Sequence, residues 1–581
     1  MIGTAPRPSA APAREPVLPR WRVYAVAAVL AAVAGALIGR LVDLQVLQGD
    51  RFREMATEEH WRRTVVPPRR GEILDANGAP LAASVTYQSL YASTNEITDP
   101  AAAAAALAPI LGQPRDALAA LLARKQSAPV LVQRWLSNEA ASAVEKLGQP
   151  GLFLQFEPRR VYPQGTLAAQ VLGVVGVDNN GLSGLELQYN ADLAGKPGAL
   201  VAERDSAGDA IALGARRYTP PVDGATLQLT LDRYVEWVAE RALEDAFDRQ
   251  HARRGTVVIL DPRTGGILAM AARPSFQPDG PDLYSPATIA LYPIPAVARA
   301  DEPGTALSFV TMAAALDTGL VGPATSIENG GAFSYYGETF RDDGPPPGRE
   351  TMARVLTSGS RVGLAWLGTR LGAAAFYRYA AAFGLGQPTG VDLPGEVAGA
   401  FRTVADADWF PTDLAHAALG TGVTVTPLQL AAAMGAVAHG GALMRPYLVR
   451  AVAGPAGSRV YYPTVVGHPV RPETAAALTA MLVAAVSSPT EGSARFARVP
   501  GYPVAGLAGQ TRAATPDGDL SIGTFVGFAP ADDPRFVGVV QIAAPAGGEP
   551  TDALAAATFA AIARPLLAYA RIPPAAAPGG T

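Results

Sequence analysis

The chain has 581 residues, 49% of them apolar and 17% charged, and its formal net charge is −4. This length suffices for two to four domains with a large core. Because the composition lacks the basic excess that nucleic-acid binding requires, we expect no nucleic-acid partner.

The chain contains no cysteine, which excludes disulfides, thiolate metal sites and cysteine nucleophiles. Its histidines are scattered without the spacing of metal ligands, and we interpret them as solvated or core residues. We therefore expect no metal site and no cofactor. These histidines are His60, His251, His416, His439 and His468.

The N-terminus carries a basic flank followed by an apolar segment. Residues 1–22 contain arginines and one glutamate, and an uncharged run follows from Val23 to Gly39. With Leu41 and Val42 it reaches the roughly 20 residues that a membrane-spanning helix needs. We predict a cytoplasmic tail (1–22), a single transmembrane helix (23–42) and an N-in orientation at the plasma membrane. The alternative is a cleaved secretory signal, which would also place residues 43–581 outside the cytoplasm.

Residues 43–215 mix short strands, turns and an alanine- and leucine-rich insert. The insert, "DPAAAAAALAPILGQPRDALAALLARK", predicts two helices broken at Gly112 to Pro114. This pattern indicates an irregular α+β module. A linker, "GARRYTPPVDGA", follows it.

Residues 225–570 begin with a strand, "TLQLTLD", an amphipathic helix, "RYVEWVAERALEDAFDRQ", and two β runs joined by Pro262, Arg263 and Thr264. A second hairpin, in "TFVGFAPADDPRFVGVVQIAA", and a helix from Thr551 to Tyr569 close the region. Strands at both ends with helices between them predict one sheet assembled from distant parts of the chain and covered by helices. We expect the tail 571–581 to be disordered.

Several motifs along the chain resemble those of one family, the class B penicillin-binding proteins, which are membrane-anchored transpeptidases of bacterial cell-wall synthesis. "VDNNGLSGLE" resembles the division or sporulation branch. The others are "PRRGEILDANGAPLAAS" (Pro68 to Ser84), "VVILDPRTGGILAMAARPSFQP", "GLGQPTGVDLPGE", "LGTGVTVTPLQLAAAMGAVAHGGALMRPYLV" and "FVGFAPADDPRFVGVV". The resemblance implies an α/β (α+β) fold: a membrane helix, a pedestal of the dimerisation type (43–215) and a transpeptidase-like domain of antiparallel sheet flanked by helices (225–570).

Three short motifs form the active site of such a family. Ser-x-x-Lys supplies a nucleophile and its base, Ser-x-Asn bridges to the leaving group, and Lys-Thr-Gly on an edge strand binds the substrate carboxylate. A hydroxyl is a poor nucleophile until a nearby base takes its proton. A lysine can take it only when its surroundings lower its pKa.

This chain departs from all three motifs. Thr305 stands at the serine and Ser308 at the lysine of the first, and Gly359 and Arg361 stand at the serine and asparagine of the second. The third has two registers: either Leu507, Ala508 and Gly509, or Gln510, Thr511 and Arg512. No lysine follows Lys196, so neither register restores the motif.

Two of these positions have a structural interpretation beside the functional one. Thr305 after Pro-Gly is suited to be a helix N-cap rather than a residual nucleophile. Arg361 is interpreted as an ion-pair partner of Asp301 or Glu302, and the alternative is that it binds a carboxylate-bearing peptide.

We expect a catalytically degenerate member of the family in peptidoglycan biogenesis. The resemblance implies partners in the membrane, namely a polytopic peptidoglycan glycosyltransferase and division or elongation proteins. The first alternative is an active D,D-transpeptidase or β-lactam-acylated enzyme that uses Thr305 with a base such as Glu302 or water. The second is a sensor that binds a muropeptide or β-lactam without a covalent bond.

Overall fold

The computed structural model describes residues 20–48, 61–126, 128–203, 216–455, 457–516 and 518–574. The chain divides into two compact units, Met1–Val66 with Pro197–Pro221, and Pro67–Lys196 with Val222–Thr581. Most of the expected cytoplasmic tail, and the expected disordered tail beyond Pro574, lie outside the described residues. The fold is mixed α+β, as the resemblance implies.

The first unit contains the N-terminal helix α1 (Arg20–Val42), which continues as a π-helical turn, Asp43–Leu47. The helical stretch Trp21–Leu47 has a mean hydropathy of 2.2 and none of it is buried, so it is long and apolar enough to cross a membrane. The predicted helix 23–42 lies within it. The helix α19 (Thr551–Tyr569) also passes this test by length and composition, but 56% of it is buried and it belongs to the core.

A three-stranded antiparallel sheet completes the first unit, with the order β1-β6-β7. Its strands are β1 (Trp61–Val66), β6 (Gly198–Glu203) and β7 (Arg216–Thr219). Four residues of the expected linker thus form a strand, because their backbone groups pair with β6 between Ala199 and Ala202.

The second unit contains a seven-stranded sheet built from both ends of the chain. Its order is β17-β16-β8-β2-β3-β4, with β5 also paired to β3. The strands are β2 (Ile73–Leu74), β3 (Pro80–Ala92), β4 (Val130–Leu136), β5 (Leu152–Val161), β8 (Thr226–Leu229), β16 (Val449–Gly454) and β17 (Gly457–Val460). Because β2 pairs with β8, the pedestal and the C-terminal region share this sheet.

Helices α3 (Pro100–Leu111) and α4 (Arg115–Leu122) confirm the predicted pair. Asp99 caps α3 by accepting from the backbone N–H groups of Ala101 and Ala102. Gly112 ends it in the left-handed conformation, φ 64°, which glycine adopts without steric cost. The other short helices of this region are α5 (Asn138–Leu147), α6 (Ala169–Leu172), α7 (Gly184–Gln188) and α8 (Asn190–Leu193).

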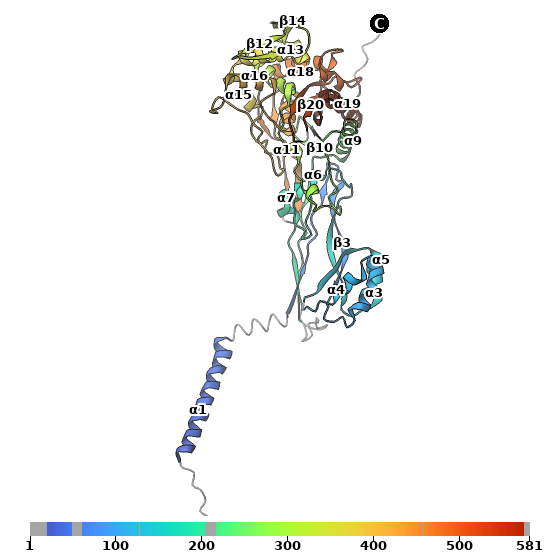
Figure 1. Cartoon of the computed structure of the whole chain (residues 1–581), viewed down its shortest axis with the longest axis vertical. Helices are drawn as coiled ribbons and strands as arrows, with labels where there is room; N and C mark the ends of the chain where they lie inside the picture. The colour runs from blue at the N-terminus through green and yellow to red at the C-terminus, as the bar shows by residue number, and fades with distance from the viewer. Residues whose placement is uncertain are drawn as a thin grey trace, which may run out of the picture. The chain divides into compact units, whose positions relative to one another are not determined.

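A five-stranded antiparallel sheet, β10-β9-β21-β20-β19, confirms the prediction of one sheet from distant segments. The strands are β9 (Arg254–Leu260), β10 (Ile267–Arg273), β19 (Ala505–Ala513), β20 (Leu520–Ala529) and β21 (Phe536–Pro545). Helix α9 (Arg233–Arg249) and α19 contact each other and pack on this sheet (Figure 1). Helix α17 (Pro427–Ala438) packs on it too.

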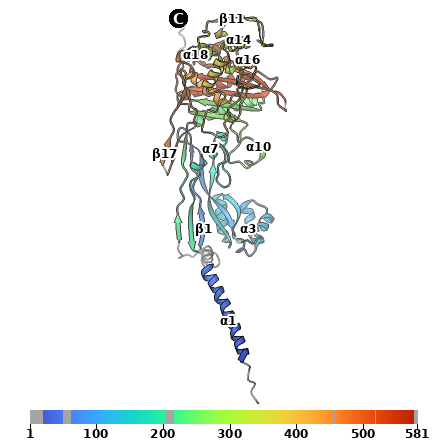
Figure 2. The same cartoon turned by 90° about the vertical axis from the view of Figure 1, so that its left-hand side faces the viewer.

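A helical region beside this sheet carries the candidate site. Figure 2 shows α14 (Arg361–Leu371) and α16 (Pro411–Leu419) side by side near β11 (Ser326–Asn329). The other helices are α10 (Pro286–Ile289), α11 (Pro295–Ala298), α12 (Ser308–Asp317), α13 (Met352–Ser358), α15 (Ala373–Ala382) and α18 (Pro472–Ser487). The short strands are β12 (Ala332–Tyr335), β13 (Glu338–Arg341), β14 (Gly348–Thr351), β15 (Leu443–Met444) and β18 (Val465–Gly467).

Candidate active-site cleft

A cavity of about 790 Å³ lies between the start of α12, the turn from α13 to α14 and the edge strand β19. It brings together residues from all three expected motifs, although they lie up to 207 positions apart. Of the motif positions predicted from the sequence, Ser308 and Gly509 do not line it. Those that do are Thr305, Gly359, Arg361, Leu507, Ala508, Gln510, Thr511 and Arg512.

Thr305 lies in a 3-10 turn, Gly304–Leu307, that precedes α12. Its hydroxyl donates a hydrogen bond to the carbonyl oxygen of Ala508, 3.0 Å away. The interpretation of Thr305 as an N-cap is wrong, because Leu307 occupies that position and no side chain caps α12. The turn places the Thr305 side chain against the edge strand instead.

Ser308 begins α12 and is 1% exposed. Its hydroxyl donates to the backbone carbonyl oxygen of Thr305, 2.7 Å away. A neutral hydroxyl is not a base near neutral pH. Its position therefore offers Thr305 no proton acceptor.

Gly359 ends α13 in the left-handed conformation, with φ 67°. A Cβ added there would lie 3.6 Å from the Thr305 hydroxyl oxygen, so the expected motif serine position faces Thr305. The next residue, Ser360, caps α14 by accepting from the N–H of Gly363 and donates to Asp342 at 2.9 Å. Ser360 therefore serves the fold of this turn.

Arg361 is exposed to the cavity at the first position of α14. The interpretation of an ion pair with Asp301 or Glu302 is wrong, because Asp301 pairs with Arg254 at 2.8 Å and Glu302 accepts from the N–H of Gly422 at 3.0 Å. Within the described ranges, no side chain pairs with Arg361. Its guanidinium remains available to a ligand.

Strand β19 passes Thr305 at Ala508 and Gly509. A Cβ added to Gly509 would lie 2.5 Å from the backbone nitrogen of Ala306 and 2.7 Å from that of Thr305, so only glycine allows this approach. The register Leu507–Gly509 is thus the one in contact with Thr305. Gln510 lies one residue further along the same cavity wall, and Thr511 donates to the carbonyl oxygen of Glu302 at 3.0 Å.

Thr421 lines the same cavity and connects it to a histidine. His416 Nδ1 lies 3.1 Å from the Thr421 hydroxyl oxygen, and His416 Nε2 lies 2.8 Å from Glu338 Oε1. The same Thr421 hydroxyl also donates to the backbone carbonyl oxygen of His416 at 3.2 Å. This is a hydroxyl, an imidazole and a carboxylate in series. Sequence reasoning missed it because Glu338 and His416 are 78 positions apart and no local spacing joins them.

The cavity lining carries equal numbers of acidic and basic side chains. The described residues hold no cluster of three or more histidine, aspartate or glutamate side chains suited to a metal ion. No lysine lines the cavity among the residues that the structure describes. The acidic lining residues are Glu302, Asp343 and Asp552, and the basic ones are Arg361, Arg495 and Arg512.

Two family models match the chain in sequence. The penicillin-binding protein dimerisation domain matches residues 65–229, and the penicillin binding protein transpeptidase domain matches residues 255–566. The chain belongs to the class B penicillin-binding proteins. The motif-based recognition and the fold expected from it are confirmed.

Named relatives of this penicillin-binding protein include a sporulation protein and a peptidoglycan D,D-transpeptidase. Stage V sporulation protein D of Bacillus subtilis is 32% identical over 519 residues, which cover 87% of this chain and 79% of that protein. The peptidoglycan D,D-transpeptidase FtsI of Escherichia coli is 29% identical over 538 residues, with 91% and 88% covered. The chain therefore has relatives in cell-wall synthesis over most of its length.

Solved structures of the family share the fold. A peptidoglycan synthetase from Bifidobacterium adolescentis superimposes with a TM-score of 0.71 at 25% identity, covering 90% of this chain and 98% of that one. Penicillin-binding protein 3 from Mycobacterium tuberculosis, solved in complex with aztreonam, has a TM-score of 0.68 at 26% identity, with 88% and 98% covered. The likeness extends over both matched domains.

Proposed function

We propose that this protein is a catalytically degenerate penicillin-binding protein that acts in peptidoglycan biogenesis by binding. It is anchored by one membrane helix, with its N-terminus in the cytoplasm and its folded domains outside. It serves as a scaffold or regulator of a cell-wall glycosyltransferase or division complex. The pedestal (43–215) and the transpeptidase-like domain (225–570) are its two functional parts.

The observation that carries the proposal is the hydrogen bonding of Thr305 and Ser308. A nucleophile needs a base within hydrogen-bond reach of its proton. The Thr305 proton is instead donated to the Ala508 carbonyl oxygen, and the residue one turn later is a buried serine bonded to the Thr305 backbone. Loss of such a base removes several powers of ten in rate.

Covalent labelling by a fluorescent penicillin tests the proposal. The full chain is purified in detergent, incubated with the probe and read by intact mass. We expect no adduct, and the variant Thr305→Val, which replaces the hydroxyl by a methyl group, behaves like the parent. An adduct that forms on the parent and is absent from Thr305→Val would refute the proposal.

The second candidate, an enzyme, is supported by the Thr421–His416–Glu338 series. An imidazole beside a hydroxyl is an arrangement that activates nucleophiles, and here the hydroxyl lines the cavity. This enzyme would label with penicillin in the parent and lose the label in Thr421→Val or His416→Asn. The site of the label, mapped by peptide mass, separates it from attack by Thr305.

The third candidate, a non-covalent sensor, is supported by the arginines of the cavity. Arg361 and Arg512 have no partner among the described residues, and guanidinium groups bind carboxylates in bidentate geometry. A muropeptide ending in a carboxylate should then raise the melting temperature of the parent. Arg361→Gln should reduce that increase, whereas Arg349→Gln in β14, which lies outside the cavity lining, should keep it.

The scaffold role is tested through the membrane helix. Because β2 of the pedestal pairs with β8 in a shared sheet, deleting residues 43–215 would unfold more than the pedestal. Replacing residues 23–42 by an unrelated apolar helix keeps the anchor and leaves the folded domains intact. Co-purification of a polytopic glycosyltransferase with the parent, reduced by this exchange, supports the scaffold role; absence of any glycosyltransferase contradicts it.

A further inference from the structure

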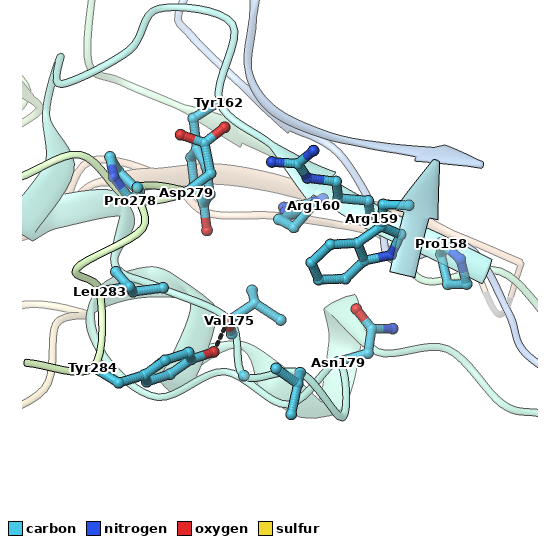
Figure 3. A pocket seen from close by; sticks show the side chains of 14 residues that line it. Pro158, Arg159, Arg160, Tyr162, Val175, Asn179, Pro278, Asp279, Leu283 and Tyr284 are labelled. Carbon is cyan, nitrogen blue, oxygen red and sulfur yellow. Dashed lines mark hydrogen bonds between the residues drawn. The ribbon is translucent and has the colours of Figure 1, made fainter. Parts of the chain in front are cut away.

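A smaller cavity, of about 130 Å³, lies beside the seven-stranded sheet of the second unit, away from the cleft. It is lined by the end of β5, by Trp135 of β4, and by the loops 175–179 and 278–284. Figure 3 shows Arg160 and Tyr162 on one side of this pocket and Val175, Leu283 and Tyr284 on the other. The expected motifs place no function here.

Three polar atoms on residues that line this pocket are themselves buried and lack a hydrogen-bond partner among the described residues. They are Nη2 of Arg160, the hydroxyl of Tyr162 and Nε1 of Trp135. Arg160 is 8% exposed and Tyr162 5% exposed. Buried polar groups are nearly always hydrogen-bonded, and leaving one unpaired is costly. Three in one pocket indicate that something supplies acceptors to them.

All three atoms are hydrogen-bond donors. The guanidinium and the indole N–H can only donate. Burial, followed by the negative charge of Glu186, raises the pKa of Tyr162 well above its usual range, so its hydroxyl keeps its proton. The group that completes this pocket must therefore present acceptors.

The buried charges beneath the pocket are unequal in number. Glu186 accepts from Arg70 Nε at 2.5 Å and from Arg160 Nε at 2.7 Å, so one buried carboxylate faces two buried guanidinium groups. Arg70 has further acceptors in the side chain of Asn190 and the backbone, whereas the hydrogen bonds of Arg160 among the described residues go to Glu186 and the Gly71 carbonyl oxygen. A buried charge without a counter-charge is costly. One positive charge remains to be compensated.

Other charged groups at the pocket do not compensate it. Arg159 adds a second cation, stacked over the Trp135 ring with its guanidinium carbon 5.2 Å from the ring centroid. Asp279 is the one carboxylate among the lining residues, and it accepts from Gln277 rather than from the three donors. The backbone of Trp135 is also held at φ 53°, an uncommon conformation for a bulky residue.

We propose that this pocket is a binding site for a small oxyanion, of the carboxylate or phosphate class, held by Arg160, Tyr162 and Trp135. Its cavity accommodates a group of a few heavy atoms, since a single water needs only about 10–15 Å³ of such volume. The site joins the pedestal strands β4 and β5 to the loop 278–284 of the transpeptidase domain. The bound anion would link these two regions through its contacts.

Titration calorimetry and thermal unfolding of the full chain in detergent test the site. The probes are sodium phosphate and sodium acetate, with sodium chloride at matched ionic strength as the control. We expect saturable binding of phosphate or acetate and a rise in melting temperature beyond that with chloride. Whichever of phosphate and acetate binds more tightly shows whether the pocket prefers a tetrahedral or a planar oxyanion.

Tyr162→Phe and Trp135→Phe each remove one donor and keep an aromatic ring. Each should weaken oxyanion binding roughly ten- to a hundredfold, because a hydrogen bond to a charged group is worth about 1.5–3 kcal/mol. Without the oxyanion, Tyr162→Phe should be as stable as the parent or more so, since it removes an unpaired buried hydroxyl. Tyr502→Phe, whose hydroxyl donates to the Ile572 carbonyl oxygen outside the pocket, is the matched control and should bind normally.

Three outcomes would overturn the proposal. One is binding of neither phosphate nor acetate above the chloride baseline. The other is binding that Tyr162→Phe and Trp135→Phe leave unchanged, which would place the anion elsewhere. The third is a loss of stability in Tyr162→Phe that is the same with and without oxyanion. That result would mean that the three donors are hydrogen-bonded to ordered water instead.

Discussion

The hydroxyl of Thr305 donates to the carbonyl oxygen of Ala508 across 3.0 Å, joining the turn before α12 to the edge strand β19. The two residues are 203 positions apart in the chain. The side chain that would be expected to attack a substrate therefore holds two elements of the fold together. Its structural role can be measured separately from any chemistry.

Thr305→Val should lower the free energy of unfolding by about 1 kcal/mol. The change keeps the shape of the side chain but removes one hydrogen bond and leaves the Ala508 carbonyl oxygen without its donor. Denaturant unfolding at neutral pH measures the effect. Thr318→Val, at a hydroxyl that bonds only within its own helix end, should change stability less. Equal losses in both variants would argue against a special role for the contact between Thr305 and Ala508.

Gly509→Ala should destabilise the protein by about 3 kcal/mol. The added methyl group would lie within 2.7 Å of three backbone atoms, in Pro303, Thr305 and Ala306, so the strand or the turn must move. Thermal unfolding measures the loss. Gly467→Ala is the control, because no heavy atom lies within 4 Å of a Cβ built there. A Gly509→Ala variant as stable as this control would mean that strand and turn approach less closely than described.

Asp317→Asn should destabilise the protein by about 1–2 kcal/mol at neutral pH, since hydrogen bonds to a charged group are lost. Although burial alone would raise the pKa of Asp317, hydrogen bonds from the Arg471 N–H, Thr474, Tyr379 and the Arg471 side chain lower it to about 2. They join the end of α12 to α15 and to the start of α18.

The destabilisation by Asp317→Asn should depend on pH, because the pKa of Asp317 is lowered in the folded protein. A carboxyl with a lowered pKa stabilises the fold above its unfolded pKa, near 3.8, and this stability is lost as the pH falls toward 2. The difference between the parent and Asp317→Asn should therefore shrink between pH 4 and pH 2. Asp282→Asn, at an exposed carboxylate, is the control.

Glu236→Gln should stabilise the protein, and more so at high pH. Burial, and then the charge of Glu240, raises the pKa of Glu236 to about 8, and one of its carboxyl oxygens has no partner among the described residues. The unfolded chain ionises near pH 4.5 while the folded protein keeps the proton until about pH 8, so the parent loses stability across this window.

The measurement is the melting temperature of both proteins at pH 4, 6 and 8. We expect a small difference at pH 4 and the largest gain for Glu236→Gln at pH 8. Glu244→Gln is the matched control on the same helix, because the Glu244 side chain is 44% exposed. A gain that is constant over this range would mean that Glu236 titrates alike in the folded and unfolded chain.

Much of the local structure was predictable because its causes are local. The break between α3 and α4 follows from Gly112 and Pro114, and the hairpin of β9 and β10 from the turn at residues 262–264. The interpretation of Thr305 as an N-cap failed because a Pro-Gly start does not reveal that the turn continues as a 3-10 helix before α12. Boundaries of this kind depend on what the turn packs against.

The sequence by itself determined the family, the order of the elements and the absence of any lysine after Lys196, since these depend only on residue identity and order. Tertiary structure alone decided where the remaining polar groups went. It joined Thr305 to Ala508 by a hydrogen bond, left Arg361 without the expected ion pair to Glu302, and placed His416 beside Glu338. It also brought Trp135, Arg160 and Tyr162, which carry unpaired donors, to the lining of one pocket. The physical reason is that hydrogen bonds and ion pairs between distant segments depend on how the elements pack, which local residue patterns do not encode.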